Sequence, residues 1–355
     1  MRPRNLWLPS VILLIGVLSI LTLRGIAPGF ATNQLLFYIV SLAAFAGVSS
    51  LPFAWFRSTR WVWYGVSLFL LIVTLIIGTT TNGSLSWLSF GSYRLQPSEL
   101  LKPALILLLA TEFGSKPVSK WENLLKFGLY LAIPVALILL QPDLGTTLII
   151  LAGAVFVFLA QKPSKKIVGA AVGSAIAVAA IAWMFFLVPY QKARIQTFFQ
   201  PQADPRGSGY NARQAVIAVG SGGTWGHGWG HGRQSHLRFL PERQTDFLFA
   251  TYAEERGWVG TGALVLLYAA LFFYITLPLQ QAQNRTELAL ALGLGMLLFA
   301  QTFINIGMNI GLTPVTGVPL PLFSLGGSSL LASCIAFGLL ESMRRSQPYE
   351  IEKIV

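Results

Sequence analysis

Carboxylates and cations gather in one short stretch of this sequence, FLPERQTDFLFATYAEERG, which covers residues 239–257. Asp246 lies where this polar stretch enters a strongly apolar run, and Glu242 and Arg243 precede it. A carboxylate can act as a general base when it reaches the proton of a reacting hydroxyl group. Ionisable groups beside a bilayer are costly and are rarely kept there without a function. Asp246 is therefore the first candidate for catalysis.

A purely local interpretation of Asp246 stays open at this point. Thr245 could cap the helix that follows, and an Asp in the first helical turn is stabilised by the helix dipole by about 0.3–1 kcal/mol. The neighbouring charges argue against that account taken alone. We expect Glu254 and Glu255, deeper in the same apolar run, to serve structure by pairing with Arg256 or with a neighbouring helix.

Glu99 and Lys102, in the motif QPSELLK of residues 96–102, are a second pair of residues that could take part in a reaction. Pro97 predicts a helix start, and residues three apart then share one helix face and can pair. An ion pair at the membrane surface is one interpretation. Lys102 would lie one turn into an apolar helix, however, and a buried Glu–Lys pair there indicates a function.

Two irregular segments complete the polar set. Asp143 lies in QPDLGT, residues 141–146, where Asp is a favoured turn residue. Residues 313–329 carry three prolines and no charge, and such irregular backbone is tolerated in a membrane only where protein covers it or it lines a cavity. Its backbone N–H groups and Ser324 could bind an anion or a sugar. A tight turn and a plain connecting loop remain the alternatives.

The longest polar segment, residues 189–245, brings the cations Lys192 and Arg194. It also contains His227 and His231, whose spacing of four resembles a metal-binding pair on a helix. The glycines around these histidines argue against that helix, so we favour an exposed polar loop over a metal site.

Composition decides which elements position these residues. The chain has 355 residues, of which 54% are hydrophobic and only 11% charged, far below the roughly 25% charged of a soluble domain. Its apolar runs are residues 11–23, 35–53, 61–77, 104–110, 133–140, 148–159, 167–188, 247–277, 288–310 and 330–340. Extended by Gly, Ser and Thr, they reach the roughly 17–25 residues of a transmembrane helix. We predict an all-α, polytopic integral membrane protein of one domain, residues 1–355, with about ten spans.

Lys and Arg placement sets the predicted orientation, because short cytoplasmic loops are basic. With Arg2 and Arg4 inside, ten spans place every short basic loop and both termini in the cytoplasm. Residues 189–245 then form a large extracytoplasmic loop between spans 7 and 8. The candidate residues share that outer face.

Four motifs, in order, carry a resemblance to a known family: QPSELLK, QPDLGTT, FLPERQTDFLFA and NIGMNIGLTPVTGVPLPLFSLGGSS. Together they resemble the SEDS family of bacterial cell-wall synthases over essentially the full chain. FLPER before QTDF resembles the elongation branch, RodA, more than the division branch, FtsW.

The resemblance implies a peptidoglycan glycosyltransferase of the bacterial inner membrane that polymerises lipid II into β-1,4 glycan during cell elongation. It places the general base on Asp246. The residues expected to bind substrate are Glu99, Lys102, Asp143, Lys192, Arg194, Glu242 and Ser324. The leaving pyrophosphate requires positive charge, from lysine and arginine or from a divalent cation, Mg²⁺ or Mn²⁺. No organic cofactor is expected.

The family also implies partners: a class B penicillin-binding protein that crosslinks the glycan, the elongation machinery and membrane lipids, with no role for nucleic acid. The alternative is a flippase for lipid II or another transporter of lipid-linked precursors. Transporters are expected to combine half-helices at the membrane midplane with charges along a path. Here the chemically competent residues cluster on one face, which favours an enzyme.

Overall fold

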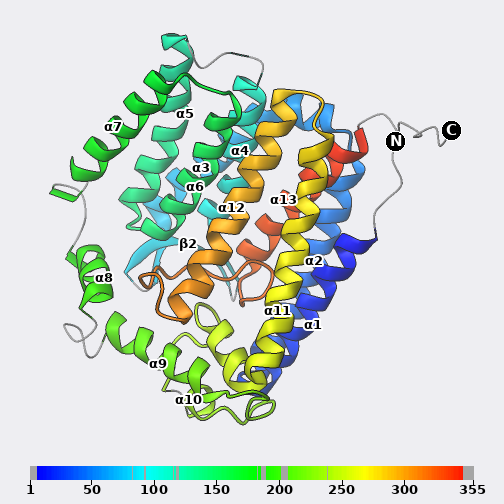
Figure 1. Cartoon of the computed structure of the whole chain (residues 1–355), viewed down its shortest axis with the longest axis vertical. Helices are drawn as coiled ribbons and strands as arrows, with labels where there is room; N and C mark the ends of the chain where they lie inside the picture. Colours follow the sequence, from blue (N-terminus) through cyan, green and yellow to red (C-terminus); the bar gives the residue numbers. More distant parts are fainter. Residues whose placement is uncertain are drawn as a thin grey trace.

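The computed structural model describes residues 6–81, 83–91, 93–114, 116, 120–181, 183–184, 189–200, 207–237 and 239–346. Across these ranges the chain folds as a bundle of long helices with one small sheet (Figure 1). Arg2 and Arg4, which supported the predicted orientation, lie outside the described residues.

Each predicted apolar run overlaps a helix in the described part of the chain, and residues 182 and 185–188 of the run 167–188 lie outside the described residues. These helices are α1 (Trp7–Ile26), α2 (Pro28–Ser50), α3 (Phe53–Ile77), α4 (Pro97–Phe113), α5 (Trp121–Leu140), α6 (Leu144–Ala160), α7 (Lys165–Ile181), α11 (Leu248–Gln281), α12 (Arg285–Asn309) and α13 (Gly327–Ser346). Six of them, α1, α2, α3, α5, α11 and α12, are long and apolar enough to cross a membrane. The prediction of a polytopic helical membrane protein is confirmed.

The predicted long loop is itself largely helical. It contains α8 (Pro189–Phe199), α9 (Ser208–Ser221) and the short α10 (Arg233–His236). In Figure 1 these helices gather at the lower end of the bundle, together with the sheet and with residues 310–326 between α12 and α13. We refer to this end as the loop-rich end.

One part of the all-α prediction was incomplete, because residues 79–95 form a small antiparallel sheet. Its strands are β1 (Thr79–Thr81), β2 (Ser84–Phe90) and β3 (Tyr93–Leu95), in the order β1-β2-β3. Gly83 and Gly91 have φ of 83° and 63°, which suits the tight connections between the strands. The strands are short, β1 is all threonine and β2 carries three serines, so they do not appear as long apolar runs.

The helix that carries Glu99 and Lys102 lies at the centre of the bundle. Nearly every residue of α4 is buried, whereas much of the surface of α3 and α5 is exposed and apolar, as expected for helices that face lipid. α6 and α12 approach closely, because a Cβ on Gly293 would lie 2.5 Å from Val157. This packing places the start of α4, the start of α6 and the end of α12 side by side at the loop-rich end.

Candidate functional site

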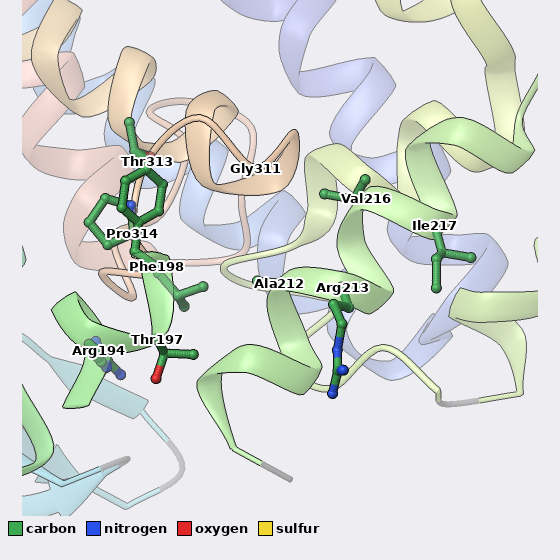
Figure 2. A pocket seen from close by; sticks show the side chains of 11 residues that line it. Arg194, Thr197, Phe198, Ala212, Arg213, Val216, Ile217, Gly311, Thr313 and Pro314 are labelled. Carbon is green, nitrogen blue, oxygen red and sulfur yellow. The ribbon is translucent and has the colours of Figure 1, made fainter. Parts of the chain in front are cut away.

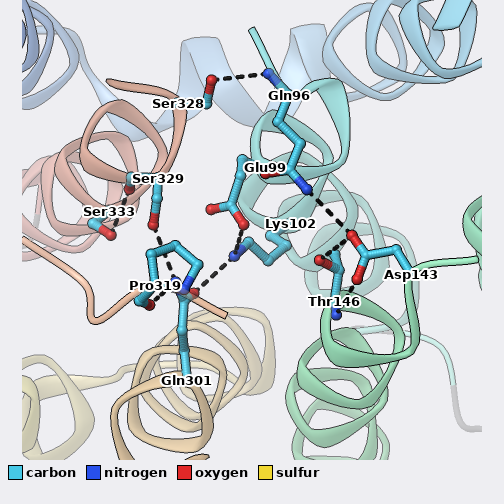
Figure 3. Close-up of polar contacts among 10 residues, drawn as sticks. All are labelled: Gln96, Glu99, Lys102, Asp143, Thr146, Gln301, Pro319, Ser328, Ser329 and Ser333. Atoms are coloured by element: carbon cyan, nitrogen blue, oxygen red, sulfur yellow. Dashed lines mark hydrogen bonds and ion pairs between the residues drawn. The ribbon is translucent and has the colours of Figure 1, made fainter. Parts of the chain in front are cut away.

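The predicted ion pair between Glu99 and Lys102 forms, and it is buried rather than at a surface. Lys102 Nζ lies 2.7 Å from Glu99 Oε1 and 2.7 Å from Gln301 Oε1 of α12 (Figure 3). The two ionic side chains are only 1% and 2% exposed. Within the described part of the chain, Glu99 Oε2 has no hydrogen-bond partner. That oxygen is also fully buried, so in this arrangement Glu99 holds Lys102 and its second oxygen is not open to a ligand.

Asp143 connects the starts of three helices. It is the N-cap of α6 and accepts from Thr146 N at 3.0 Å and Thr146 Oγ1 at 2.8 Å. Gln96, just before α4, donates Nε2 to Asp143 Oδ2 at 3.2 Å and its backbone N–H to Ser328 Oγ of α13 at 2.9 Å (Figure 3). Burial raises the pKa of the Asp143 carboxyl, and the bonds from Thr146 oppose that rise. The local-turn interpretation of Asp143 is confirmed.

Asp246 belongs to the turn before α11, not to the first turn of that helix. α11 begins at Leu248 after Phe247, which makes no side-chain cap. Thr245 does not cap this helix, so that interpretation was wrong. Its hydroxyl instead donates to Glu242 Oε2 at 3.1 Å, inside a turn that holds Glu242 at a φ of 49°.

The carboxyl of Asp246 faces a cation across a glycine. A Cβ on Gly317 would lie 3.5 Å from Asp246 Oδ2 and 3.5 Å from Arg194 Nη1. Arg194 is held there because Nη1 donates to the carbonyl of Thr316 at 2.9 Å. Burial and then the Glu242 carboxylate raise the pKa of Asp246, and Arg194 lowers it, with a net pKa of about 7. A carboxyl with a pKa near neutral pH is well matched to general-base chemistry.

A cavity of about 290 Å³ adjoins Arg194 between α8, α9 and the start of the segment 310–326 (Figure 2). Its walls are mainly apolar, and both Arg194 and Arg213 contribute to them. The residues that line it are Arg194, Thr197, Phe198, Ala212, Arg213, Val216, Ile217, Gly311, Thr313, Pro314 and Val315. An apolar cavity with cations at its boundary suits an amphiphile whose charged end is anionic.

Two predicted substrate residues have contacts of another kind. Lys192 Nζ lies 5.9 Å from the centre of the Trp183 ring, a distance typical of a cation–π contact. The buried hydroxyl of Ser324 accepts the N–H of Leu320 at 3.0 Å and so shapes the segment 310–326. Direct contact of Lys192 and Ser324 with a substrate stays a prediction.

Glu254 and Glu255 hold the glycine-rich loop in place. Glu254 accepts from Gln234 N at 2.7 Å, Ser235 N at 3.0 Å and Ser235 Oγ at 2.8 Å, all in α10. Glu255 Oε1 accepts from Gly230 N at 2.9 Å. The predicted structural pairing with a neighbouring helix is confirmed for Glu254, whereas Glu255 bonds to the loop itself. Arg256 interacts electrostatically with Glu255, although no hydrogen bond joins the two within the described residues, and its guanidinium lies over the Trp229 ring, 3.6 Å from the ring centre.

The histidines of that loop lie at its surface. His227 and His231 are exposed, and His231 Nδ1 lies 2.7 Å from the carbonyl of Trp229. Across the described ranges, no group of three or more His, Cys, Asp or Glu side chains is arranged to hold a metal ion.

Three residues of α12 that the sequence analysis missed belong to this site. Gln301, Asn305 and Asn309 lie four residues apart and are at most 1% exposed. Amides four residues apart in an otherwise apolar helix lie on one face of that helix. This spacing in the sequence could have identified them as candidate site residues. Neutral amides carry no charge, so they do not stand out among ionisable candidates.

Comparison with known proteins decides the family. The FtsW/RodA/SpoVE family model, described as "Cell cycle protein", matches residues 6–349. The chain belongs to this family. It is 40% identical over 283 residues to peptidoglycan glycosyltransferase MrdB of Escherichia coli strain K12, covering 79% of this chain and 76% of that protein. It is 37% identical over 325 residues to the probable peptidoglycan glycosyltransferase FtsW of Thioalkalivibrio sulfidiphilus, covering 89% and 80%. The resemblance to the SEDS family is thereby confirmed.

Solved structures of SEDS proteins share the fold. One, reported as "Structural coordination of polymerization and crosslinking by a peptidoglycan synthase complex", matches with a TM-score of 0.84 and 28% identity, over 97% of this chain and 98% of that chain. The crystal structure of the Thermus thermophilus rod shape determining protein RodA matches with a TM-score of 0.70 and 27% identity, over 96% of each chain.

Proposed function

We propose that this SEDS protein is a peptidoglycan glycosyltransferase that polymerises lipid II into β-1,4 glycan during cell elongation. One observation carries the proposal: the carboxyl of Asp246, with a pKa of about 7, faces Arg194 across Gly317. A base beside a cation is what a reaction needs when it deprotonates a hydroxyl and expels an anion. The family membership and the names of the relatives support the same activity.

In the proposed reaction the acceptor sugar hydroxyl attacks the anomeric carbon of the donor. The new glycosidic bond forms as the bond to the pyrophosphate oxygen breaks, and Asp246 takes the hydroxyl proton. Arg194 and Lys102 supply positive charge where negative charge develops on the leaving group. Glu99 keeps the Lys102 ammonium group in place. Asp143 and Glu242 shape the charge around the site, and Lys192 and Ser324 extend its contacts with the substrate.

The apolar cavity of Figure 2, of about 290 Å³, is too small for a whole polyprenyl chain, and in this proposal it takes the isoprene units nearest the pyrophosphate. Its position next to Arg194 would hold these units with the pyrophosphate beside the cation. A divalent cation, Mg²⁺ or Mn²⁺, belongs to this proposal as an ion that accompanies the substrate pyrophosphate. We assign no step to it, and no organic cofactor is proposed.

We propose the following placement in the cell. The protein crosses the inner membrane ten times with both termini in the cytoplasm, and its loop-rich end is extracytoplasmic. The helices α8–α10 then form the outer loop between spans 7 and 8. Its partner is a class B penicillin-binding protein of the elongation machinery, in keeping with the peptidoglycan synthase complex among the similar structures.

The deciding experiment is polymerisation of labelled lipid II by the purified protein with its penicillin-binding partner, with and without divalent ions. We expect a ladder of glycan products from the wild type and none from Asp246→Asn. Polymer that persists in the Asn variant would assign the base to another carboxylate, with Glu99 and Asp143 tested next. If no condition yields polymer while labelled lipid II crosses vesicle membranes, the protein is a flippase instead.

A further inference from the structure

The amides of α12 contact both halves of the site. Gln301, Asn305 and Asn309 form a line, which we term the α12 amide stripe, and it extends about 12 Å along the helix axis at 1.5 Å per residue. All three side chains are buried among apolar residues. Buried amides are costly unless bonded, so their partners indicate what they hold in place.

At one end, the stripe holds the backbone of the candidate base. Asn305 Nδ2 and Asn309 Nδ2 donate to the same oxygen, the carbonyl of Asp246, at 3.0 and 3.1 Å. Asn309 Oδ1 also accepts from Ala250 N, in the first turn of α11, at 3.1 Å. The carbonyl of Asp246 and the first turn of the helix that follows it are therefore both tied to α12.

In the middle, the stripe holds the segment 310–326 at two successive carbonyls. Asn305 Nδ2 donates to the carbonyl of Val318 at 2.7 Å, and Gln301 Nε2 donates to that of Pro319 at 3.0 Å. Val318 follows Gly317, the glycine between Asp246 and Arg194. The position of that glycine is thus tied to α12 as well.

At the other end, the stripe reaches the buried ion pair. Gln301 Oε1 accepts from Lys102 Nζ at 2.7 Å, and Gln301 Nε2 also donates to Ser329 Oγ of α13 at 3.1 Å (Figure 3). Lys102 therefore has two acceptors, Glu99 and Gln301, which fix its ammonium group from two helices.

We infer that the α12 amide stripe positions the site: it sets the separation between Asp246 and Lys102 and aligns the segment 310–326 between them. The stripe residues act through Asp246, Lys102 and the loop carbonyls, so they are positioning residues. The inference rests on the proposed glycosyltransferase function. A network whose members are all bonded is rigid, and rates respond steeply to small displacements of a reacting group.

The test compares Asn309→Leu and Asn305→Leu with Thr302→Val in the full-length protein with its penicillin-binding partner. Thr302 lies on the same helix off the stripe, is buried, and donates only to the carbonyl of Leu298 in its own helix at 2.9 Å. Each variant is measured for lipid II polymerisation over a range of lipid II concentrations and pH values, and for its thermal midpoint.

For the Leu variants we expect kcat to fall by about 10-fold to 100-fold while KM changes less than about threefold, because the base is displaced and the substrate contacts remain. The acid limb of the pH–rate profile should also move, since the surroundings of Asp246 change. Asn309→Gln keeps a donor amide and should recover most of the lost rate. Thr302→Val should keep the kcat and the pH profile of the wild type.

Two results would overturn the inference. One is Leu variants whose kcat, KM and pH profile match the wild type. The other is a loss of kcat that is proportional to the loss of thermal midpoint in the Leu, Gln and Val variants alike. That result would mean that the amides contribute only to helix packing. Both leave wild-type polymerisation intact, so the proposed function survives them. If the wild type makes no glycan, the proposed function and this inference are both wrong.

Discussion

Asp246 and Glu254 are eight residues apart, and both are carboxylates next to the same helix, yet their surroundings differ sharply. Glu254 is fully buried, and its two oxygens accept three hydrogen bonds from Gln234 and Ser235. Asp246 is partly exposed, and the α12 amides bond its backbone carbonyl and not its carboxyl. The Glu254 carboxylate therefore holds a loop in place, whereas the Asp246 carboxylate is positioned through its backbone and its oxygens can react.

The difference teaches that hydrogen-bond saturation, together with burial and neighbouring charge, separates a structural acid from a candidate base. A carboxylate that accepts several donors from backbone N–H groups is stabilised as an anion and gains little from taking a proton. The carboxyl of Asp246 is instead raised to a pKa of about 7 by burial and by Glu242. It can therefore exchange a proton near neutral pH.

The strongest test of this comparison is Asp246→Asn, for which we expect a loss of polymerisation rate of about 10²-fold to 10⁴-fold, the usual contribution of a general base. The Asn side chain keeps the shape, and the amides of α12 still bond the backbone carbonyl. The thermal midpoint should therefore stay close to that of the wild type. A variant that loses activity only because it unfolds would contradict the assignment.

The matching substitution on the other side is Glu254→Gln. The substitution replaces one carboxylate oxygen by an NH₂ group, which is a donor and cannot accept from the N–H groups of α10. The lost hydrogen bond to a charged group contributes about 1.5–3 kcal/mol. We expect a free energy of unfolding lower by about that amount, and a polymerisation rate per folded molecule within a few-fold of the wild type. Denaturation and rate are measured on the same preparation. A rate loss as large as that of Asp246→Asn would remove the distinction between the two acids.

Much of the fold could be predicted from the sequence, because apolar runs and flanking Pro residues are local signals. The predicted start of α4 at Pro97 is the start that the structure shows. The sheet at β1–β3 and the kink of α11 at Gly257, with φ 63° and ψ −165°, were not predicted. Both depend on how the chain packs at the loop-rich end, which no local pattern reports.

The site was partly predictable for the same reason. Glu99 and Lys102 pair within one helix, so their spacing was sufficient. Arg194 and Asp246 come together only through the segment 310–326, and Gln301 meets Lys102 across two helices. Such contacts follow from the packing of α12, because a neutral amide meets its backbone carbonyl only when distant segments come together.

A third prediction concerns why the loop held by Glu254 and Glu255 is rich in glycine. A Cβ on Gly226 would lie 2.2 Å from the carbonyl oxygen of Glu255, and its φ of 77° disfavours other residues. Gly226→Ala should therefore destabilise the protein by about 1–3 kcal/mol, as overpacking does. Gly220→Ala in α9 is the control, since nothing lies within 4 Å of its added Cβ. Equal thermal midpoints for the two variants would show that the loop does not depend on this close approach.

The smallest expected effect is a shift of the pH–rate profile in Glu242→Gln. Asp246 takes a proton only when ionised, so the polymerisation rate of the wild type should rise with pH through about 7. Because the Glu242 carboxylate raises the pKa of Asp246, its removal lowers that pKa and moves the acid limb to lower pH. Arg194→Gln should move the limb to higher pH, since Arg194 lowers the same pKa. Each profile is normalised to its own maximum, so that lost substrate contacts do not obscure the shift. Limbs that stay in place, or that both move in one direction, would show that the titrating group is not a carboxyl between these two charges.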